Sequence, residues 1–143
     1  MSAAHVVLGV ALIAVNVAAG ALGVWRWHRG ELSRAFWPLL RTGQALVVLE
    51  ALDGVVLLLL GEDLPRLHLI YGLVPLGVAF IAEQLRLTSA QAVLDQRGVA
   101  TARELPEADQ DAAVLDILLR EMGVMAASAL VVAALGLRAG GVL

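Results

Sequence analysis

The sequence has no cysteine, no lysine and few aromatic residues. Without cysteine there can be no disulfides, thiolate metal sites, iron–sulfur clusters or covalently attached c-type haem. Histidine is then the only strong nitrogen ligand for a metal, and the three candidates are His5, His28 and His68. All ten basic residues are arginine, and together with an Ala, Leu, Val and Gly bias this is typical of a GC-rich bacterial genome.

Charged residues are scarce as well, at 16% of the 143 residues, whereas 60% are hydrophobic. The mean hydropathy is +0.85, and soluble domains are about 45–50% apolar. This composition predicts a membrane protein, with the lipid bilayer as its first partner and no nucleic-acid partner. The first apolar run has no basic residue before it and exceeds the roughly 7–15 residues of a signal peptide core. We therefore expect it to be a mature transmembrane helix.

Four apolar runs reach the length of about 20 residues that a helix needs to cross a bilayer. They predict one domain with an all-α fold, an integral membrane four-helix bundle. The expected helices cover about residues 4–25, 39–60, 67–86 and 107–138. The third can extend to residue 96, and the fourth begins as an amphipathic helix in the cytoplasm.

The distribution of arginine predicts the orientation of the chain, because cytoplasmic loops are enriched in basic residues. Eight of the ten arginines fall in the two loops that join the first helix to the second and the third to the fourth. Both termini are then outside, in a bacterial cytoplasmic (inner) membrane. His5 and His68 begin their helices at that outer face, and His28 lies on the opposite side.

Each of these two outer histidines is followed one helical turn later by a glycine, Gly9 and Gly72 respectively. Two imidazoles at matched depth can ligate the iron of haem b, and four-helix bundles commonly build such sites in their core. The glycines would leave room for the porphyrin, and a tyrosine or arginine at the rim would bind its propionates. The candidate haem residues are His5, His68, Gly9, Gly72, Tyr71 and Arg66.

The 63-residue separation of His5 and His68, and the residues that precede His68, carry a family resemblance. The matching positions are Gln44, Gly54, Leu60-Gly61, Leu64-Pro65 and Leu67-His68. Residues 5–85 resemble one four-helix half of the haem A synthase family, and they are more loosely similar to cytochrome b561-type membrane bundles. In that family, each half places one haem-ligating histidine near the outer end of a helix and its partner two helices later.

The chain departs from the family at positions that matter for catalysis. The catalytic half of a haem A synthase has a glutamate three residues before its first histidine and an arginine after it, where this chain has Ser2 and Val6. The family also has eight helices. The resemblance therefore implies a non-enzymatic haem-b module with His5 and His68 as axial ligands. Such a module would act in electron transfer or as an accessory subunit of a respiratory or haem-handling complex, as a homodimer or with another membrane protein.

The apolar runs also contain polar side chains, namely Asn16, Gln44, Glu50 and Asp53. An acid at membrane depth costs about 2.5–3.5 kcal/mol on insertion scales, and Glu50 and Asp53 share one helical face because they are three residues apart. One interpretation is hydrogen bonding between helices, to Asn16, Gln44 or Ser128. A second interpretation is that the two acids form part of a proton or cation path. A third is that they interact with a histidine or with haem.

These acids support an alternative function, a cofactor-free accessory subunit or transporter-like protein that uses Glu50 and Asp53. In that case the histidines hydrogen-bond the backbone or lipid headgroups. A transition-metal site made by His5, His68 and Asp53 is a further hypothesis.

Overall fold

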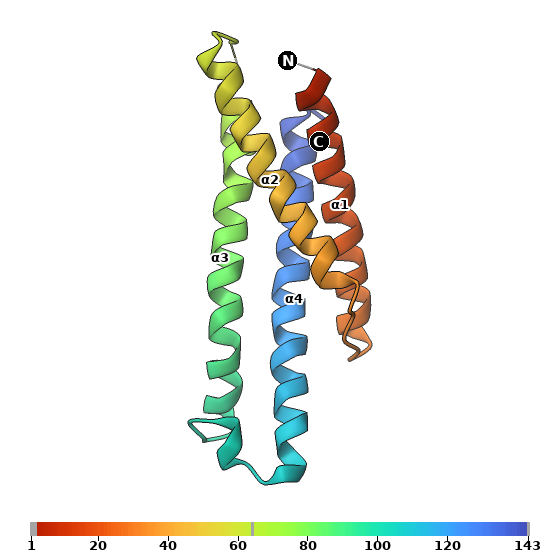
Figure 1. The fold of residues 1–143 in the computed structure, drawn as a ribbon, viewed down its shortest axis with the longest axis vertical. Helices are drawn as coiled ribbons and strands as arrows, with labels where there is room; N and C mark the ends of the chain where they lie inside the picture. Colours follow the sequence, from red (N-terminus) through yellow and green to blue (C-terminus); the bar gives the residue numbers. More distant parts are fainter. Residues whose placement is uncertain (1–2, 64, 143) are drawn as a thin grey trace.

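The computed structural model describes residues 3–63 and 65–142, so Ser2 and Leu64, two of the residues compared with the family, lie outside the described residues. The described residues form helices α1 (Ala3–His28), α2 (Phe36–Leu59), α3 (Arg66–Gln96) and α4 (Glu107–Ala139), with a 3₁₀ turn η1 (Ala102–Glu104) (Figure 1). Each of the four α-helices is long and apolar enough to cross a membrane. The predicted all-α fold with four such helices is confirmed.

Proline and glycine set most of the helix boundaries. Pro38 lies in the first turn of α2, while Pro65 and Pro106 immediately precede α3 and α4. Proline suits these positions because the first turn of a helix has no hydrogen-bond partners for its N–H groups. The predicted extension of α3 to residue 96 is confirmed, and the chain then turns at Gly98, which has a φ of 71°.

Helix α4 is the central element of the bundle. It packs along both α1 and α3, while α2 packs on α1, crosses α4 obliquely and ends beside the start of α3 (Figure 1). Over most of their length α1 and α3 are therefore separated by α4. Both termini lie at one end of the molecule, which we call the terminal end. At the opposite end the α3–α4 hairpin extends well beyond α1 and α2 (Figure 1).

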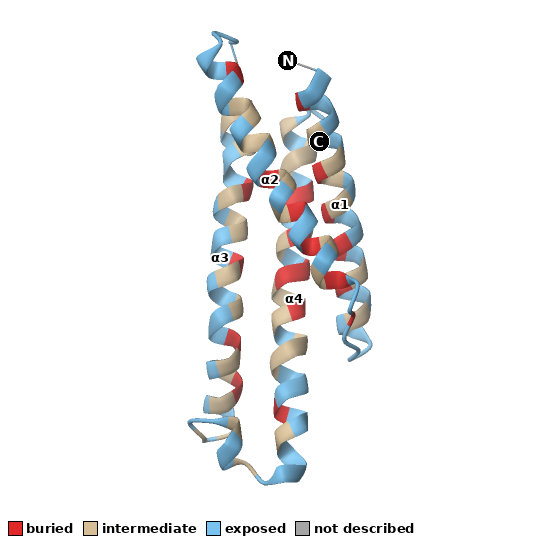
Figure 2. Cartoon of the chain, in the orientation of Figure 1, coloured by how far each residue is buried: buried red, intermediate tan, exposed pale blue. Residues whose placement is uncertain are grey.

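The core lies where α1, α2 and α4 meet, and α3 contributes few buried residues (Figure 2). The buried residues of α1 recur at the helical period and form one face, at His5, Leu12, Asn16, Ala19, Gly20 and Gly23. Glycine allows close packing there, since a Cβ on Gly23 would lie 2.5 Å from the Phe36 ring. Small residues at helix contacts are typical of bundles in lipid. Met122 and Met125 of α4 are fully buried in this core.

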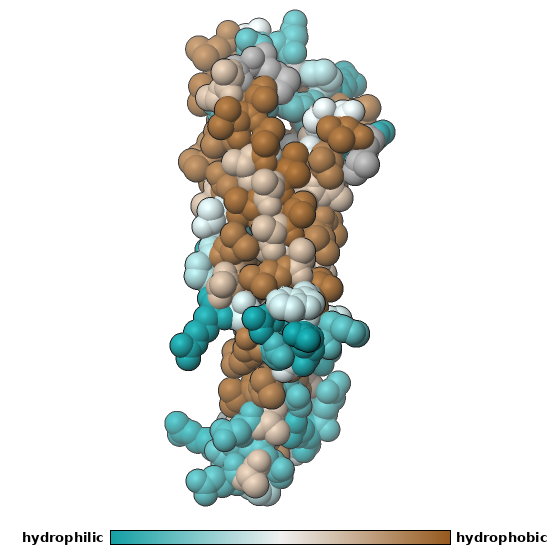
Figure 3. Space-filling view, turned by 90° about the vertical axis from the view of Figure 1, so that its right-hand side faces the viewer, coloured by the Kyte–Doolittle hydropathy of each residue, from teal (hydrophilic) through white to brown (hydrophobic). Residues whose placement is uncertain are grey.

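The outer surface of the helices is apolar over most of its length towards the terminal end. Figure 3 shows this apolar band, a belt of polar side chains below it, and a hydrophilic tip on the α3–α4 hairpin. Exposed leucine, valine and isoleucine side chains from α1, α2 and α3 contribute to the exposed apolar surface. A surface of this kind is compatible with a multi-pass membrane protein, because it would be costly in water.

An ion-pair network joins α2, α3 and α4 away from the terminal end. Glu83 accepts hydrogen bonds from Arg41 and Gln44 of α2 and from Arg86 of its own helix, the latter at 2.9 Å. Arg86 also lies 3.3 Å from Glu121 of α4. Gln44, predicted to be an intramembrane polar residue, thus belongs to this network.

Candidate functional site

His5 and His68 meet at the terminal end of the bundle. Their Nε2 atoms are 3.4 Å apart, and their ring centroids are 5.6 Å apart with the planes tilted by 52°. Each histidine is the third residue of its helix, so the contact joins the first turns of α1 and α3. The haem hypothesis required the first and third helices to be adjacent at this depth. They are adjacent there, although they do not pack along their length.

The second nitrogen of each imidazole faces an oxygen. His5 Nδ1 is 2.9 Å from Asp53 Oδ2, and His68 Nδ1 is 3.1 Å from the main-chain oxygen of Ala139. A carbonyl oxygen can only accept, so His68 Nδ1 must donate, and an ionised Asp53 likewise fixes a donor on His5 Nδ1. In two neutral rings, both Nε2 atoms then carry lone pairs. Two lone pairs at 3.4 Å repel, so a proton shared by the rings or a cation between them would stabilise the pair.

Glu50 is the third titratable group beside His5. Its Oε1 lies 3.4 Å from His5 Nε2, and its Oε2 is buried without a hydrogen-bond partner in the described part of the chain. A Cβ on Gly9 would lie 3.1 Å from Glu50 Oε1. Gly9 was predicted to leave room for a porphyrin, but in this conformation it leaves room for the Glu50 carboxylate.

The two acids of α2 share one face, as predicted, and both point to His5. The alternative that they hydrogen-bond Asn16, Gln44 or Ser128 is wrong for the described residues. Asn16 and Ser128 donate to main-chain carbonyls of their own helices, and Gln44 belongs to the Glu83 network. The partnership with a histidine is the interpretation that the structure shows.

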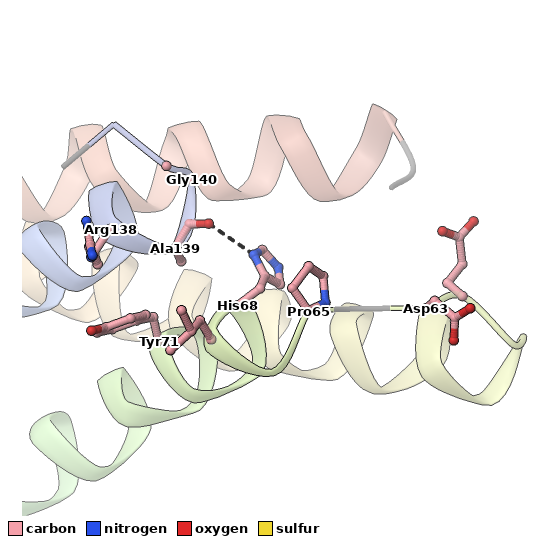
Figure 4. A pocket seen from close by; sticks show the side chains of 10 residues that line it. Asp63, Pro65, His68, Tyr71, Arg138, Ala139 and Gly140 are labelled. Atoms are coloured by element: carbon pink, nitrogen blue, oxygen red, sulfur yellow. Dashed lines mark hydrogen bonds between the residues drawn. The ribbon is translucent and has the colours of Figure 1, made fainter.

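Two cavities adjoin the histidine pair. An apolar cavity of about 360 Å³ lies towards the middle of the bundle. Its lining includes His5, Gly9, Glu50, Gly54, His68 and Gly72. A more polar cavity of about 560 Å³, which we call the outer cavity, lies at the terminal end (Figure 4). Its lining includes Glu62, Asp63, His68, Tyr71, Arg138 and Gly140. His68 and Tyr71 therefore border both cavities.

Arg138 takes the place that the sequence analysis gave to Arg66. Arg66 is exposed and lines neither cavity, whereas the Arg138 guanidinium lies 5.8 Å from the centre of the Tyr71 ring. This distance is within the range of a cation–π contact. The arginine count used to predict the orientation leaves Arg66 and Arg138 on the outer side. The sequence therefore offered both as candidates for this position. Only the packing of α4 shows which of them faces the histidines.

The hypothesis of a metal site made by His5, His68 and Asp53 is not supported. Among the described residues, no group of three His, Cys, Asp or Glu side chains is arranged to hold a metal ion. The physical reason is that Asp53 binds His5 at Nδ1, whereas His68 approaches at Nε2. His28 is exposed at the last residue of α1, so it takes no part in the site.

Comparisons with protein families, with known proteins and with solved structures find no match for this chain. The function is therefore argued from the geometry of the site.

Proposed function

We propose that this chain is an integral membrane protein that binds haem b between His5 and His68. The observation that supports this most strongly is the pair of Nε2 atoms 3.4 Å apart, with each Nδ1 held by an oxygen. Metal-ligating histidines almost always donate their second N–H to a carboxylate or a backbone carbonyl. Bonds from a metal to imidazole are about 2.0 Å long, so two axial nitrogens lie about 4 Å apart. The rings need to separate by only about 0.6 Å from their present 3.4 Å.

The two cavities differ in polarity, as the two ends of an amphiphilic ligand do. The apolar cavity, which Gly54 and Gly72 border, would hold the macrocycle, and the outer cavity with Arg138 would hold its two carboxylates. The side chain that does not fit is Glu50, because its carboxylate is 3.4 Å from His5 Nε2. Haem binding therefore requires Glu50 to rotate away from the histidine.

A haem with two histidine ligands supplies one-electron transfer, since no coordination position stays open. The residues of this chain would hold the two imidazoles in one tautomer through Asp53 and the Ala139 carbonyl, and the apolar cavity would exclude water. Such a protein fits an electron-transfer or accessory subunit of a respiratory or haem-handling complex in a bacterial inner membrane. It would work as a homodimer or with another membrane protein.

The orientation proposed for this protein places both termini outside. It is supported by the position of both termini at one end of the bundle (Figure 1) and by the eight arginines that lie away from that end, in the α1–α2 and α3–α4 connections or on the adjoining helices. The histidine pair would then lie near the outer face of the membrane.

The direct test is an absorption spectrum of the full-length protein purified with haem available. We expect a sharp Soret band typical of a six-coordinate, low-spin haem, and the loss of that low-spin band in His5→Ala and in His68→Ala. His28→Ala is the matched control, because His28 is exposed at the other end of α1 and its loss should leave the spectrum unchanged. A colourless wild-type preparation refutes the proposal.

A second candidate is a cofactor-free, transporter-like protein in which a proton lies between the two histidines. Among the residues that the structure describes, the buried Oε2 of Glu50 beside His5 has no hydrogen-bond partner, and this supports it, since a buried oxygen without a partner costs about 1–3 kcal/mol. This function predicts a proton flux in vesicles that Glu50→Gln abolishes. Glu107→Gln is the control, because Glu107 is an exposed acid at the first residue of α4, at the opposite end of the molecule from the histidine pair (Figure 1). A wild-type protein that conducts no protons excludes this candidate.

A further inference from the structure

The connection between α1 and α2, with the helix ends beside it, carries an excess of positive charge. Residues 25–41 contain four arginines and a single glutamate. Two of these arginines pair with acids of the protein. Arg26 Nη1 lies 2.5 Å from Glu31 Oε2, and Arg41 pairs with Glu83 of α3. The other two arginines keep this region positively charged.

These two remaining cations are Arg29 and Arg34. Both residues are exposed, and neither forms an ion pair with an acid among the residues that the structure describes. A guanidinium binds a phosphate through two parallel N–H bonds, and it is more weakly hydrated than an ammonium. Arg29 and Arg34 are therefore available to an anion from outside the protein.

The same connection presents apolar and aromatic side chains. Trp25 and Trp27 are each 50% exposed, and Leu32, which lies between the two arginines in the sequence, is 43% exposed. Tryptophan is enriched where the hydrocarbon region of a membrane meets the headgroups. The connection lies on the right-hand side of Figure 1 and so faces the viewer in Figure 3, where the polar belt borders directly on the apolar band. Arg29 and Arg34 are therefore placed at the level of lipid headgroups.

The surroundings of Trp25 favour one kind of headgroup. The guanidinium carbons of Arg26 and Arg29 lie 4.8 and 5.1 Å from the centre of the Trp25 ring. A choline headgroup would need a cation–π contact of the same kind, and the two cations already at this ring would repel its ammonium. A stacked guanidinium keeps N–H groups at its edge for a phosphate. The connection thus favours a phosphate headgroup that has no compensating ammonium.

We propose that the α1–α2 connection binds an anionic phospholipid. Arg29 and Arg34 hold its phosphate, and Trp25 and Trp27 lie beside its glycerol and the first part of its acyl chains. An acidic protein or a nucleic acid would match the charge but would leave the exposed tryptophan and leucine side chains in water. This inference goes beyond the proposed haem function and does not rest on it, since the histidine pair takes no part.

The test uses tryptophan fluorescence, because all three tryptophans, Trp25, Trp27 and Trp37, lie within this region. The full-length protein is placed in phosphatidylcholine vesicles with a small fraction of phosphatidylglycerol whose brominated acyl chains quench a tryptophan that they touch. An arginine near an anionic surface contributes about 1 kcal/mol, or roughly fivefold in affinity. We expect phosphatidylglycerol to be enriched beside the tryptophans by roughly 25-fold relative to brominated phosphatidylcholine at the same fraction. High salt should reduce this enrichment, because it screens exposed charges.

The variants assign the enrichment to the two arginines. Arg29→Gln and Arg34→Gln should each reduce it by about fivefold, and the double variant should remove it. Arg103→Gln is the matched control, because Arg103 is an exposed arginine on η1 of the α3–α4 hairpin, and it should leave the enrichment unchanged.

Two results would overturn the proposal. One is phosphatidylglycerol that quenches no more than phosphatidylcholine does in the wild-type protein. The other is an enrichment that the double variant retains, which would place the lipid elsewhere on the protein. The haem spectrum should be the same in all variants. A colourless wild-type protein that still enriches phosphatidylglycerol would refute the haem function alone.

Discussion

Gly72 offers the sharpest test of whether the apolar cavity holds a ligand. A Cβ built on Gly72 meets no atom within 4 Å, and the residue borders the cavity of about 360 Å³. The first atom of a leucine side chain at this position therefore has open space in the empty fold. Its side chain has four heavy atoms and takes up about 120 Å³, at roughly 30 Å³ for each, the volume of one water molecule in the liquid. That is more than a quarter of the cavity, so Gly72→Leu competes directly with a bound macrocycle.

The expected loss of haem affinity in Gly72→Leu follows from the free-energy cost of overpacking a filled cavity. Forcing extra methylene groups into a filled interior costs about 1–3 kcal/mol. Since each 1.4 kcal/mol changes an equilibrium constant tenfold, Gly72→Leu should weaken haem binding by roughly 5- to 150-fold. Haem titration followed at the Soret band measures this directly.

Gly77 provides the matched control, because it lies on the same helix, its Cβ would also meet open space, and it does not line the apolar cavity. Replacing a helical glycine by leucine improves helix propensity by up to about 1 kcal/mol, and this gain is the same in both variants. Gly77→Leu should bind haem as the wild type does. If Gly72→Leu and Gly77→Leu bind haem equally well, the apolar cavity is not the haem site.

Three further predictions test the packing, the acid and the orientation. Gly23→Ala should lower the free energy of unfolding by about 1–3 kcal/mol in detergent, because the new Cβ would lie 2.5 Å from a buried aromatic ring; an unchanged melting temperature contradicts the packing. Glu50→Gln should bind haem at least as tightly as the wild type, since the charge that must leave the histidine is removed; a loss of haem would show that Glu50 supports the ligand. A single cysteine is a clean topology probe in a chain that has none. Gly141→Cys should react with an impermeant reagent on intact cells and Thr101→Cys only after lysis, and the reverse pattern would invert the orientation.

The fold could be predicted because its signals are local. Apolar runs of sufficient length locate the helices, and Pro38, Pro65, Pro106 and Gly98 limit them. With the third helix extended to residue 96, the predicted bounds lie within three residues of those observed. The buried face of α1 follows from the 3.6-residue period of its small and polar residues. The order of packing was not predictable in this way. The central position of α4 depends on which faces fit together in space, and no single run of residues encodes that.

The site was predictable in part. Matched position at the start of two helices was enough to select His5 and His68, and the structure brings their Nε2 atoms to 3.4 Å. The choice of Asp53 as a partner depends on the rotation of α2 relative to α1, which sequence periodicity does not define. The hydrogen-bond partner of His68 is the main-chain oxygen of Ala139. Every residue has a main-chain oxygen, so the sequence cannot show which of them His68 contacts.

The end of α4 decides where a site of this kind can form. Below the terminal end, α4 lies between α1 and α3 (Figure 1), so side chains of these two helices cannot meet there. Where α4 stops at Ala139, the first turns of α1 and α3 face each other, and the last carbonyl of α4 holds one of the two imidazoles. One more turn would add about 5.4 Å of helix and would fill the space in which the histidines meet. His5 comes from α1, its carboxylate partner from α2, His68 from α3 and the carbonyl from α4. The site therefore assembles only when all four helices have packed, because each of them supplies one of the groups that meet there.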